Sequence, residues 1–277
     1  MILDFWSIFS HESKITPAGG DLLSLLYQRS MKVAELTDAA AMHEAAALLN
    51  RIWGTGDEHV VDPGTMRALA HIGNYVAGAY DGDTLVGASV GFFAADGHLH
   101  SHVTGIAPEH QGHGVGRALK LHQRDWALAR GRTAISWTFD PLIARNAYFN
   151  LHTLGATAVE YLPDFYGSMR DAVNAGIASD RIYVLWRLEA EPPPVPDVAD
   201  RVALLDRADN LPVPGRLIER ASTVAIPLDI ERLRATDPDV AVRWRMAVRH
   251  AMMDAQQHGY RITGFSRDGR YLMEAGT

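Results

Sequence analysis

Three observations predict a mixed α/β fold for this chain of 277 residues. Short runs rich in β-branched and aromatic residues alternate with alanine-rich runs of helical length, in the order β-α-α-β-β-β-α-β-α-β-β. Two of these strands flank Asp81-Gly82-Asp83, which is typical of a hairpin turn. The segment from Ser101 to Arg117 joins a strand to a helix through a glycine-rich turn.

Local signals bound each element of this first domain. The expected strands are 32–36, 75–80, 84–93, 102–106, 133–139, 156–161 and 181–188. The expected helices are 39–53, 63–71, 116–130 and 144–154. Asp38 is placed to cap the first helix, and Pro63 suits the first turn of the second. Gly131 and Gly155 are placed to end the third and fourth helices.

A smaller part is expected beyond this domain, which we place at residues 31–188. The proline-rich residues 189–200 are expected to form a stiff linker. A β-α-β-β unit follows, with strands and helix at 221–227, 238–258, 261–266 and 270–274. Because this unit has too little surface to bury a core alone, we expect residues 201–277 to pack on the first domain.

Residues 1–30 are expected to be an N-terminal extension outside the catalytic core. The extension is either an upstream start, with a second start at Met31, or an arm on a neighbour. Its apolar run at 1–9 lacks a basic flank and carries Asp4, so it is a poor match to a signal peptide.

Composition excludes several classes of function. The net charge is −7, from 26 Lys and Arg against 33 Asp and Glu, which argues against a nucleic-acid partner. There is no cysteine, so disulfides, thiolate metal sites and a cysteine nucleophile are excluded. No run of about 18 apolar residues exists, so we expect no membrane span and a cytoplasmic protein.

The segment from Ser101 to Arg117 has the features of an anion site. Its strand breaks at Pro108 and leads into a helix through Gln111, Gly112, Gly114 and Gly116. Glycines let the backbone approach a ligand, and the first N–H groups and the dipole of a helix attract negative charge. We therefore expect a phosphate or pyrophosphate here. The spacing is not that of a dinucleotide turn, whose third glycine is replaced by Arg117, nor of a Walker turn, which needs G-K-[ST].

The pattern Q-x-x-G-x-G at 111–116, preceded by Ile106-x-Pro108-Glu109, resembles the acyl-CoA pyrophosphate loop of the GNAT acyltransferase superfamily. A second similar element is N-x-x-F-N-x-x-x-L-G at 146–155. The likeness covers about residues 31–188 and implies a mostly antiparallel sheet flanked by helices. The phrase at 139–150, with Phe165-Tyr166-Gly167 downstream, resembles one branch of the superfamily that has a C-terminal extension.

The resemblance also implies which residues meet acyl-CoA. Strand residues Thr104, Gly105 and Ile106 would bond the pantetheine arm. The pyrophosphate would lie on the turn formed by Gln111, Gly112, His113, Gly114, Val115, Gly116 and Arg117. Asn146 would order the neighbouring loop or contact CoA. Acetyl-CoA and succinyl-CoA are both open as donors, and no metal is expected.

The general acid is a point of departure from the superfamily, in which a tyrosine usually precedes the Leu of the L-G element by three residues. That position is Leu151 here, which has no proton to give. Tyr148, one helical turn earlier, is the candidate acid, with a half-buried structural aromatic as the plain alternative. Tyr161 and Tyr166 are the other candidates.

Three histidines alternate along one expected strand, at His98, His100 and His102, and so share a face. His102 is nearest the turn and is the candidate base or amine-positioning group, whereas solvated side chains are the plain interpretation for the other two. A metal held by three imidazoles is the less favoured alternative, because no carboxylate or cysteine stands at ligand spacing.

Three further residues are candidates for binding the acceptor. Asp140, before Pro141, is either a structural turn residue or a ligand for the amine. Arg245 and Arg249 lie one turn apart beside the apolar stripe of the C-terminal helix, and such a like-charge pair is unfavourable unless an anion is near. The plain alternative is two solvated arms. The functional one is a clamp for a substrate carboxylate, with Arg245 as its main member.

These patterns support three hypotheses. The first is an N-acyltransferase that moves an acetyl or succinyl group from CoA to a small amine or amino acid. The second is transfer to a protein N-terminus or lysine. The third is a non-catalytic acyl-CoA-binding or regulatory module, which Leu151 keeps open. We expect a small-molecule partner, neither nucleic acid nor membrane, and leave a homodimer open.

Overall fold

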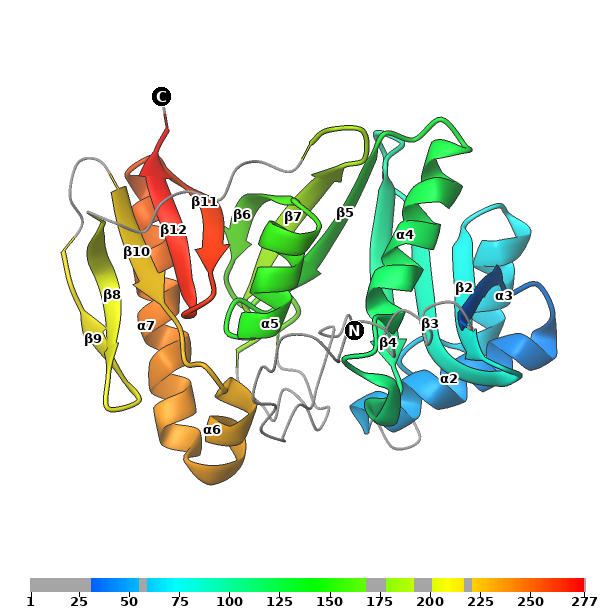
Figure 1. Ribbon diagram of the computed structural model, residues 1–277, viewed down its shortest axis with the longest axis horizontal. Helices are drawn as coiled ribbons and strands as arrows, with labels where there is room; N and C mark the ends of the chain where they lie inside the picture. Colours follow the sequence, from blue (N-terminus) through cyan, green and yellow to red (C-terminus); the bar gives the residue numbers. More distant parts are fainter. Residues whose placement is uncertain (1–30, 55–58, 168–177, 192–200, 217–220, 277) are drawn as a thin grey trace, which may run out of the picture. The chain divides into compact units, whose positions relative to one another are not determined.

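The computed structural model describes residues 31–54, 59–167, 178–191, 201–216 and 221–276 (Figure 1). Internal contacts divide the described residues into two compact units, one up to residue 135 and the other from residue 136 onward. The division falls inside strand β5 (Ala134–Phe139) and not at the expected linker. The expected N-terminal extension and residues 192–200 of the linker lie outside the described residues.

The first unit holds four strands that pair in chain order, each antiparallel to the next. They are β1 (Met31–Glu35), β2 (Tyr75–Asp81), β3 (Thr84–Phe93) and β4 (Leu99–Ile106). The helical elements are α2 (Ala39–Trp53), α3 (Pro63–His71), the 3₁₀ turn η1 (Pro108–His110) and α4 (Val115–Leu128). Every expected element of this unit is present.

Helices α2 and α4 cover opposite faces of these strands (Figure 1). A Cβ at Gly87 would meet Val115 and Leu119 of α4, whereas a Cβ at Gly105 would meet side chains of α2. Gly105 pairs with Ala88, the neighbour of Gly87, and neighbouring strand residues point to opposite faces. The β4 strand therefore lies between two helical layers.

Local chemistry accounts for the ends of these elements. The Asp38 carboxylate accepts from the Ala41 N–H at 2.9 Å, as expected of the α2 cap. Asp62 caps α3 in the same way. Gly54 ends α2 with φ of 59°, a left-handed conformation that suits glycine.

The second unit holds β5, β7 (Arg181–Arg187) and β6 (Thr157–Leu162), in that sheet order. A separate five-stranded sheet has the order β11-β12-β10-β8-β9. Its strands are β8 (Val202–Ala208), β9 (Leu211–Pro214), β10 (Ala221–Ala225), β11 (Tyr260–Ser266) and β12 (Arg270–Ala275). Only β8 and β10 are parallel among the pairings described here, so the predicted mixed, mostly antiparallel α/β fold is confirmed.

The C-terminal region is larger than the expected β-α-β-β unit. It adds β8, β9 and the short helix α6 (Ile230–Thr236) to the predicted strands and to helix α7 (Pro238–Gln257). The predicted apolar stripe of α7 is buried, and Arg245 and Met252 are buried with it. Trp244 Nε1 donates to the Asn210 carbonyl at 2.7 Å, which ties α7 to the β8–β9 turn.

A second difference lies after β5, where one continuous helix was expected over 144–154. The structure has one α-helical turn, α5 (Ala144–Ala147), followed by the π-helix η2 (Tyr148–Thr153). Such wide turns are frequent at functional sites. Within the described residues, no helix is long and apolar enough to cross a membrane.

Candidate functional site

The turn from Gln111 to Gly114 brings backbone N–H groups to the start of α4. Gly112 and Gly114 have φ of 78° and 86°, values that L side chains rarely adopt. Gly114 is the N-cap of α4, and no side chain caps this helix, whereas Asp residues cap α2, α3, α6 and α7. The first helical bond runs from Ala118 N to Gly114 O at 2.9 Å. The N–H groups that precede it point out of the helix end, as an anion site requires.

The predicted Gln111 has a structural part in this turn. It is 4% exposed, and its Nε2 donates to the Ile106 carbonyl at 3.2 Å. The side chain thus ties the turn to the last residue of β4. The neighbouring His113 and Arg117 are exposed, so two cationic or polar side chains border the glycines.

The side chains of the strand predicted to bind the pantetheine arm, residues 104–106, pack inside the protein. Thr104 is buried, and its hydroxyl lies 2.7 Å from the Ser89 hydroxyl. Ile106 belongs to an apolar cluster with Val115 and Leu119. A Cβ at Gly105 would lie 2.8 Å from side-chain atoms of Leu49 and Trp53, so glycine is required there by the packing of α2. Any bond from these residues to a ligand would therefore come from the backbone.

His102 occupies a bulge of β4. Val90 pairs with Val103 and Gly91 with Ser101, which leaves His102 as the extra residue. Its ring lies 5.2 Å from that of Phe92, which also contacts His100 at 5.4 Å, so these two histidines share a face as expected. Burial, and then the neighbouring His100, lower the pKa of His102 to about 4, so its imidazole is neutral at pH 7.

The alternative of a metal held by His98, His100 and His102 gains no support. Among the described residues, no group of three or more histidines and carboxylates is arranged to hold a metal ion. His98 instead contacts Asp96, with 2.5 Å between Nδ1 and Oδ1.

Tyr148, the candidate acid, is the first residue of η2 and is half-buried. Its ring stacks on that of His152, with centroids 4.4 Å apart and planes 21° apart. Its hydroxyl oxygen accepts from Arg267 Nε at 3.0 Å. Arg267, between β11 and β12, was not among the residues predicted from the sequence.

The two alternative tyrosines are engaged elsewhere. The Tyr161 hydroxyl donates to Asp180 Oδ2 at 2.5 Å, and burial, followed by the Asp180 charge, raises the pKa of Tyr161. The Tyr166 hydroxyl lies 3.0 Å from Thr138 Oγ1. The role of Tyr148 as the acid stays a prediction.

Two of the predicted acceptor residues, Asp140 and Arg245, form a buried ion pair. Asp140 Oδ2 accepts from Arg245 Nη2 and from Arg234 Nη2, each at 2.6 Å. Its Oδ1 accepts from the Leu142 N–H at 2.8 Å, which is the turn contact that Asp140 was expected to make in its structural interpretation. Burial disfavours the Asp140 charge, yet Arg245 and then Arg234 hold its pKa well below the usual range.

Arg249 pairs with a different carboxylate. Its Nε donates to Asp180 Oδ2 at 3.0 Å, and its Nη2 contacts Oδ1. The repulsion between Arg245 and Arg249, from which a substrate carboxylate was predicted, is thus relieved by Asp140 and Asp180. The Arg245 side chain is 2% exposed and that of Arg249 is 19% exposed. Their role toward substrate stays a prediction.

Asn146 lies in α5 and is 1% exposed. Its side-chain oxygen and nitrogen are both buried and have no hydrogen-bond partner among the described residues. The structure therefore gives this amide no loop-ordering bond of its own, and its contact with CoA stays a prediction.

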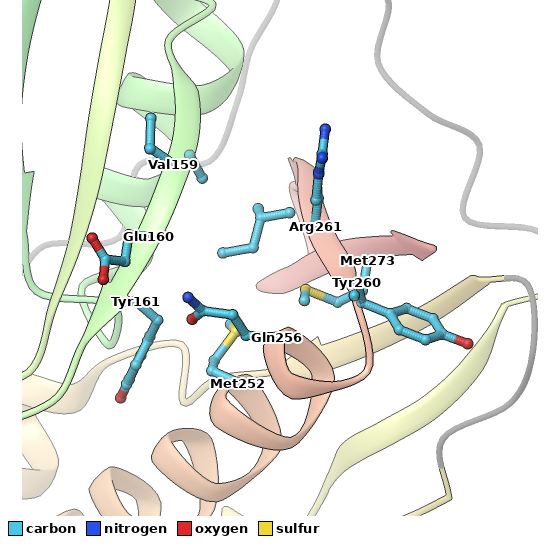
Figure 2. Close-up of a pocket in the computed structure, with 11 residues that line it drawn as sticks. Val159, Glu160, Tyr161, Met252, Gln256, Tyr260, Arg261 and Met273 are labelled. Atoms are coloured by element: carbon cyan, nitrogen blue, oxygen red, sulfur yellow. The ribbon is translucent and has the colours of Figure 1, made fainter. Parts of the chain in front are cut away.

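A cavity of about 240 Å³ lies between β6, β11 and α7. Figure 2 shows Val159, Glu160 and Tyr161 of β6 around it, together with Met252 and Gln256 of α7. The β6 and β11 strands are each at the edge of their sheet. An extended segment could thus pair with a free strand edge there.

Lys120 is a buried group that sequence reasoning missed. It lies in α4, is 2% exposed, and donates to Ser101 Oγ at 2.9 Å and Gln123 Oε1 at 3.1 Å. Burial lowers the pKa of Lys120 to about 7. A lysine on an amphipathic helix normally faces water, so no local pattern marks this one.

Residues 41–151 match the family model described as Acetyltransferase (GNAT) family. A search of curated proteins found no match. Among solved structures, yncA from Salmonella typhimurium, described with its cofactor acetyl-CoA, is 19% identical with a TM-score of 0.47 and covers 60% of this chain and 99% of its own.

Two other similar structures are transferases that act on ribosomal proteins. The ribosomal-protein-S18-alanine N-acetyltransferase from Escherichia coli is 13% identical, with a TM-score of 0.46 over 60% of this chain and 99% of its own. The ribosomal-protein-S5-alanine acetyltransferase from Vibrio fischeri is 17% identical, with a TM-score of 0.46 over 59% and 96%. Residues 41–151 of this chain therefore match the GNAT acetyltransferase family, the family that the sequence resembles.

Proposed function

We propose that the protein is an N-acyltransferase that moves an acetyl or succinyl group from CoA to a small amine or amino acid. The observation that carries the proposal is the turn at 111–116. Its two left-handed glycines stand before a helix that no side chain caps, within the stretch that matches the family. The amides of this turn would hold the pyrophosphate of acyl-CoA, and the backbone of Thr104, Gly105 and Ile106 would bond its pantetheine arm.

Acyl transfer needs a deprotonated amine, a donor to the oxyanion and a proton for the leaving thiolate. The neutral imidazole of His102 can accept a proton from the attacking amine or hold the amine in place. With a pKa of about 4 it is a weak base, so positioning is its larger role. Tyr148 would give its hydroxyl proton to the thiolate. Holding both substrates side by side supplies much of the remaining rate.

The turn is tested by Gly114→Glu, which adds bulk, backbone strain and negative charge where the pyrophosphate would lie. Calorimetry should show at least a tenfold loss of CoA affinity, since a charge-assisted contact contributes about 1.5–3 kcal/mol. Gly73→Glu is the matched control, because Gly73 has a similar φ of 85° and open surroundings. Equal CoA affinity in both folded variants would contradict the assignment.

The acceptor is tested by a screen of thiol release with several acyl-CoAs and many amines. Arg249 is the more exposed of the two predicted clamp residues, so Arg249→Ala should raise the KM of amino acids and not that of uncharged amines. If none of the amines supports thiol release although CoA binds normally, the result would favour the non-catalytic module instead.

A second candidate function is transfer to a peptide N-terminus. The groove between the edge strands β6 and β11 favours it, because an extended peptide could add main-chain hydrogen bonds at either edge. Val159 on β6 is 55% exposed and offers apolar contact there. Thiol release with short peptides that exceeds release with the same free amino acids would favour this function over the first.

A further inference from the structure

The contact between Tyr148 and Arg267 joins two segments that lie 119 residues apart. Tyr148 begins the π-helix η2, and Arg267 lies in the turn between β11 and β12. Besides the 3.0 Å hydrogen bond from Nε, the guanidinium carbon lies 5.9 Å from the centre of the tyrosine ring. The tyrosine ring also stacks on His152. The Tyr148 side chain is thus contacted by both Arg267 and His152.

Side-chain hydrogen bonds stabilise the turn that carries Arg267. Ser266 Oγ donates to Asp268 Oδ1 at 2.5 Å, and Arg270 Nε donates to Asp268 Oδ2 at 2.9 Å. Arg270 also reaches Asp206 of β8, with 2.7 Å between Nη2 and Oδ1. Gly269 supplies the left-handed residue of the turn, with φ of 81°. The side chain of Arg267 points out of this turn and reaches Tyr148. The hydrogen bonds of the turn hold the Arg267 backbone in place.

The direction of the hydrogen bond matters for proton transfer. A guanidinium has donors and no acceptor, so Arg267 can only donate, and the tyrosine oxygen accepts. The Tyr148 O–H proton therefore stays available for another acceptor. Once that proton leaves, the phenolate faces a cation, and a hydrogen bond between charged partners is about twice as strong as a neutral one.

The superfamily's usual tyrosine position cannot take this part here. Leu151 is 7% exposed and lines an apolar cavity of about 240 Å³ together with residues 261–264 of β11. That position thus faces the C-terminal sheet, whereas Tyr148, one turn earlier, faces Arg267 and keeps part of its surface in solvent.

We propose that Arg267 is a positioning residue for Tyr148, which it holds in one orientation and whose phenolate it stabilises after proton transfer. This inference rests on the proposed function. In the step concerned, the amine nitrogen bonds to the thioester carbon, the carbon–sulfur bond breaks, and the thiolate takes the Tyr148 proton. The amine loses its own proton to water, and Tyr148 regains one from solvent. The net products are the amide and free CoA.

The test is a double-mutant cycle on thiol release with the best acceptor found in the screen. Arg267→Gln should lower kcat about tenfold and leave the KM of acyl-CoA unchanged, because one charge-assisted contact to the transition state is lost. Tyr148→Phe should lower kcat about a hundredfold. In the Tyr148→Phe background, Arg267→Gln should have no further effect. Arg267→Lys, which can still donate, should recover part of the rate.

Arg243→Gln is the matched control, since Arg243 is an exposed arginine of α7 in the same unit. Thermal melts of all variants should coincide, because Arg267 is exposed. If Arg267→Gln acts like Arg243→Gln, or lowers kcat equally with and without Tyr148, Arg267 does not act through the phenol. A Tyr148→Phe enzyme of full activity would overturn both the acid assignment and this inference, while leaving acyl transfer itself established. If no acceptor supports thiol release, the proposed function is wrong, and this inference falls with it.

Discussion

Replacing Lys120 by methionine should stabilise the protein at neutral pH and change how its stability depends on pH. Lys120 is 2% exposed, and burial lowers its pKa from the usual 10.5 to about 7. Each pKa unit is equivalent to 1.36 kcal/mol, so keeping this ammonium buried costs at most about 5 kcal/mol at pH 7 or below. Methionine fills a similar volume without a charge.

The sign of the pH effect follows from proton binding. Between pH 7 and 10.5 the unfolded chain keeps the Lys120 proton, whereas the folded protein has largely released it. Because the unfolded state binds more protons, the contribution of Lys120 to stability rises with pH through this window and is lost as pH falls toward 7. The methionine variant lacks this term. Its advantage over the wild type should be about 2–3 kcal/mol at pH 7, since Ser101 and Gln123 each lose a hydrogen bond worth about 1 kcal/mol.

Urea unfolding at pH 7, 8.5 and 10 measures the difference directly. The stability of the variant minus that of the wild type should fall by about 3–4 kcal/mol between pH 7 and 10, so the wild type should become the more stable protein near pH 10. Lys32→Met, at an exposed lysine of β1, should leave the curve unshifted. Stability curves for wild type and Lys120→Met that run parallel in pH would show that the charge of Lys120 is not buried, and the reasoning would fail.

Two further substitutions test the packing around the site. Gly105→Ala should lower the free energy of unfolding in urea by about 1–3 kcal/mol, because the added Cβ would overlap Leu49 and Trp53. Gly131→Ala is the comparison, because it adds a Cβ to a left-handed glycine that has open space around it. Asp140→Asn should cost about 3–5 kcal/mol in thermal unfolding, because Arg245 would stay buried without its counter-charge. The Asp140 contribution, present above pH 4 because its folded pKa is lowered, should disappear as the wild type is acidified and be missing from the asparagine variant at any pH.

Signals that act over a few residues made the first unit and the turn predictable. Asp38 and Gly54 bound α2 through contacts within four residues, and Gly112 and Gly114 adopt left-handed conformations that glycine allows. Strands β8 and β9 were not predicted, because no such local signal marks the turn between them. Their turn uses Asp209 and Asn210 at φ of 48° and 62°, without the glycine that marks such turns in a sequence.

Contacts between residues far apart in the sequence could not be predicted from the sequence alone. The i, i+4 spacing of Arg245 and Arg249 correctly indicated that an anion must lie near, but nothing in one sequence identifies it. The carboxylates that the structure supplies are Asp140 and Asp180, 105 and 69 residues away. Lys120 illustrates the same limit, since the helix period alone places a lysine in solvent and only the packing of β4 buries it.

The C-terminal region acts on the last part of the family-matched stretch. Three polar side chains from the end of β5 to the first residue of η2 contact charged partners there. Asp140 pairs with Arg234 and Arg245, Arg145 pairs with Glu231, and Tyr148 accepts from Arg267. A buried carboxylate without its cations costs several kcal/mol, so this stretch and the C-terminal region must fold together. The residues beyond the matched stretch therefore supply the charged partners of these three side chains, the candidate acid Tyr148 included.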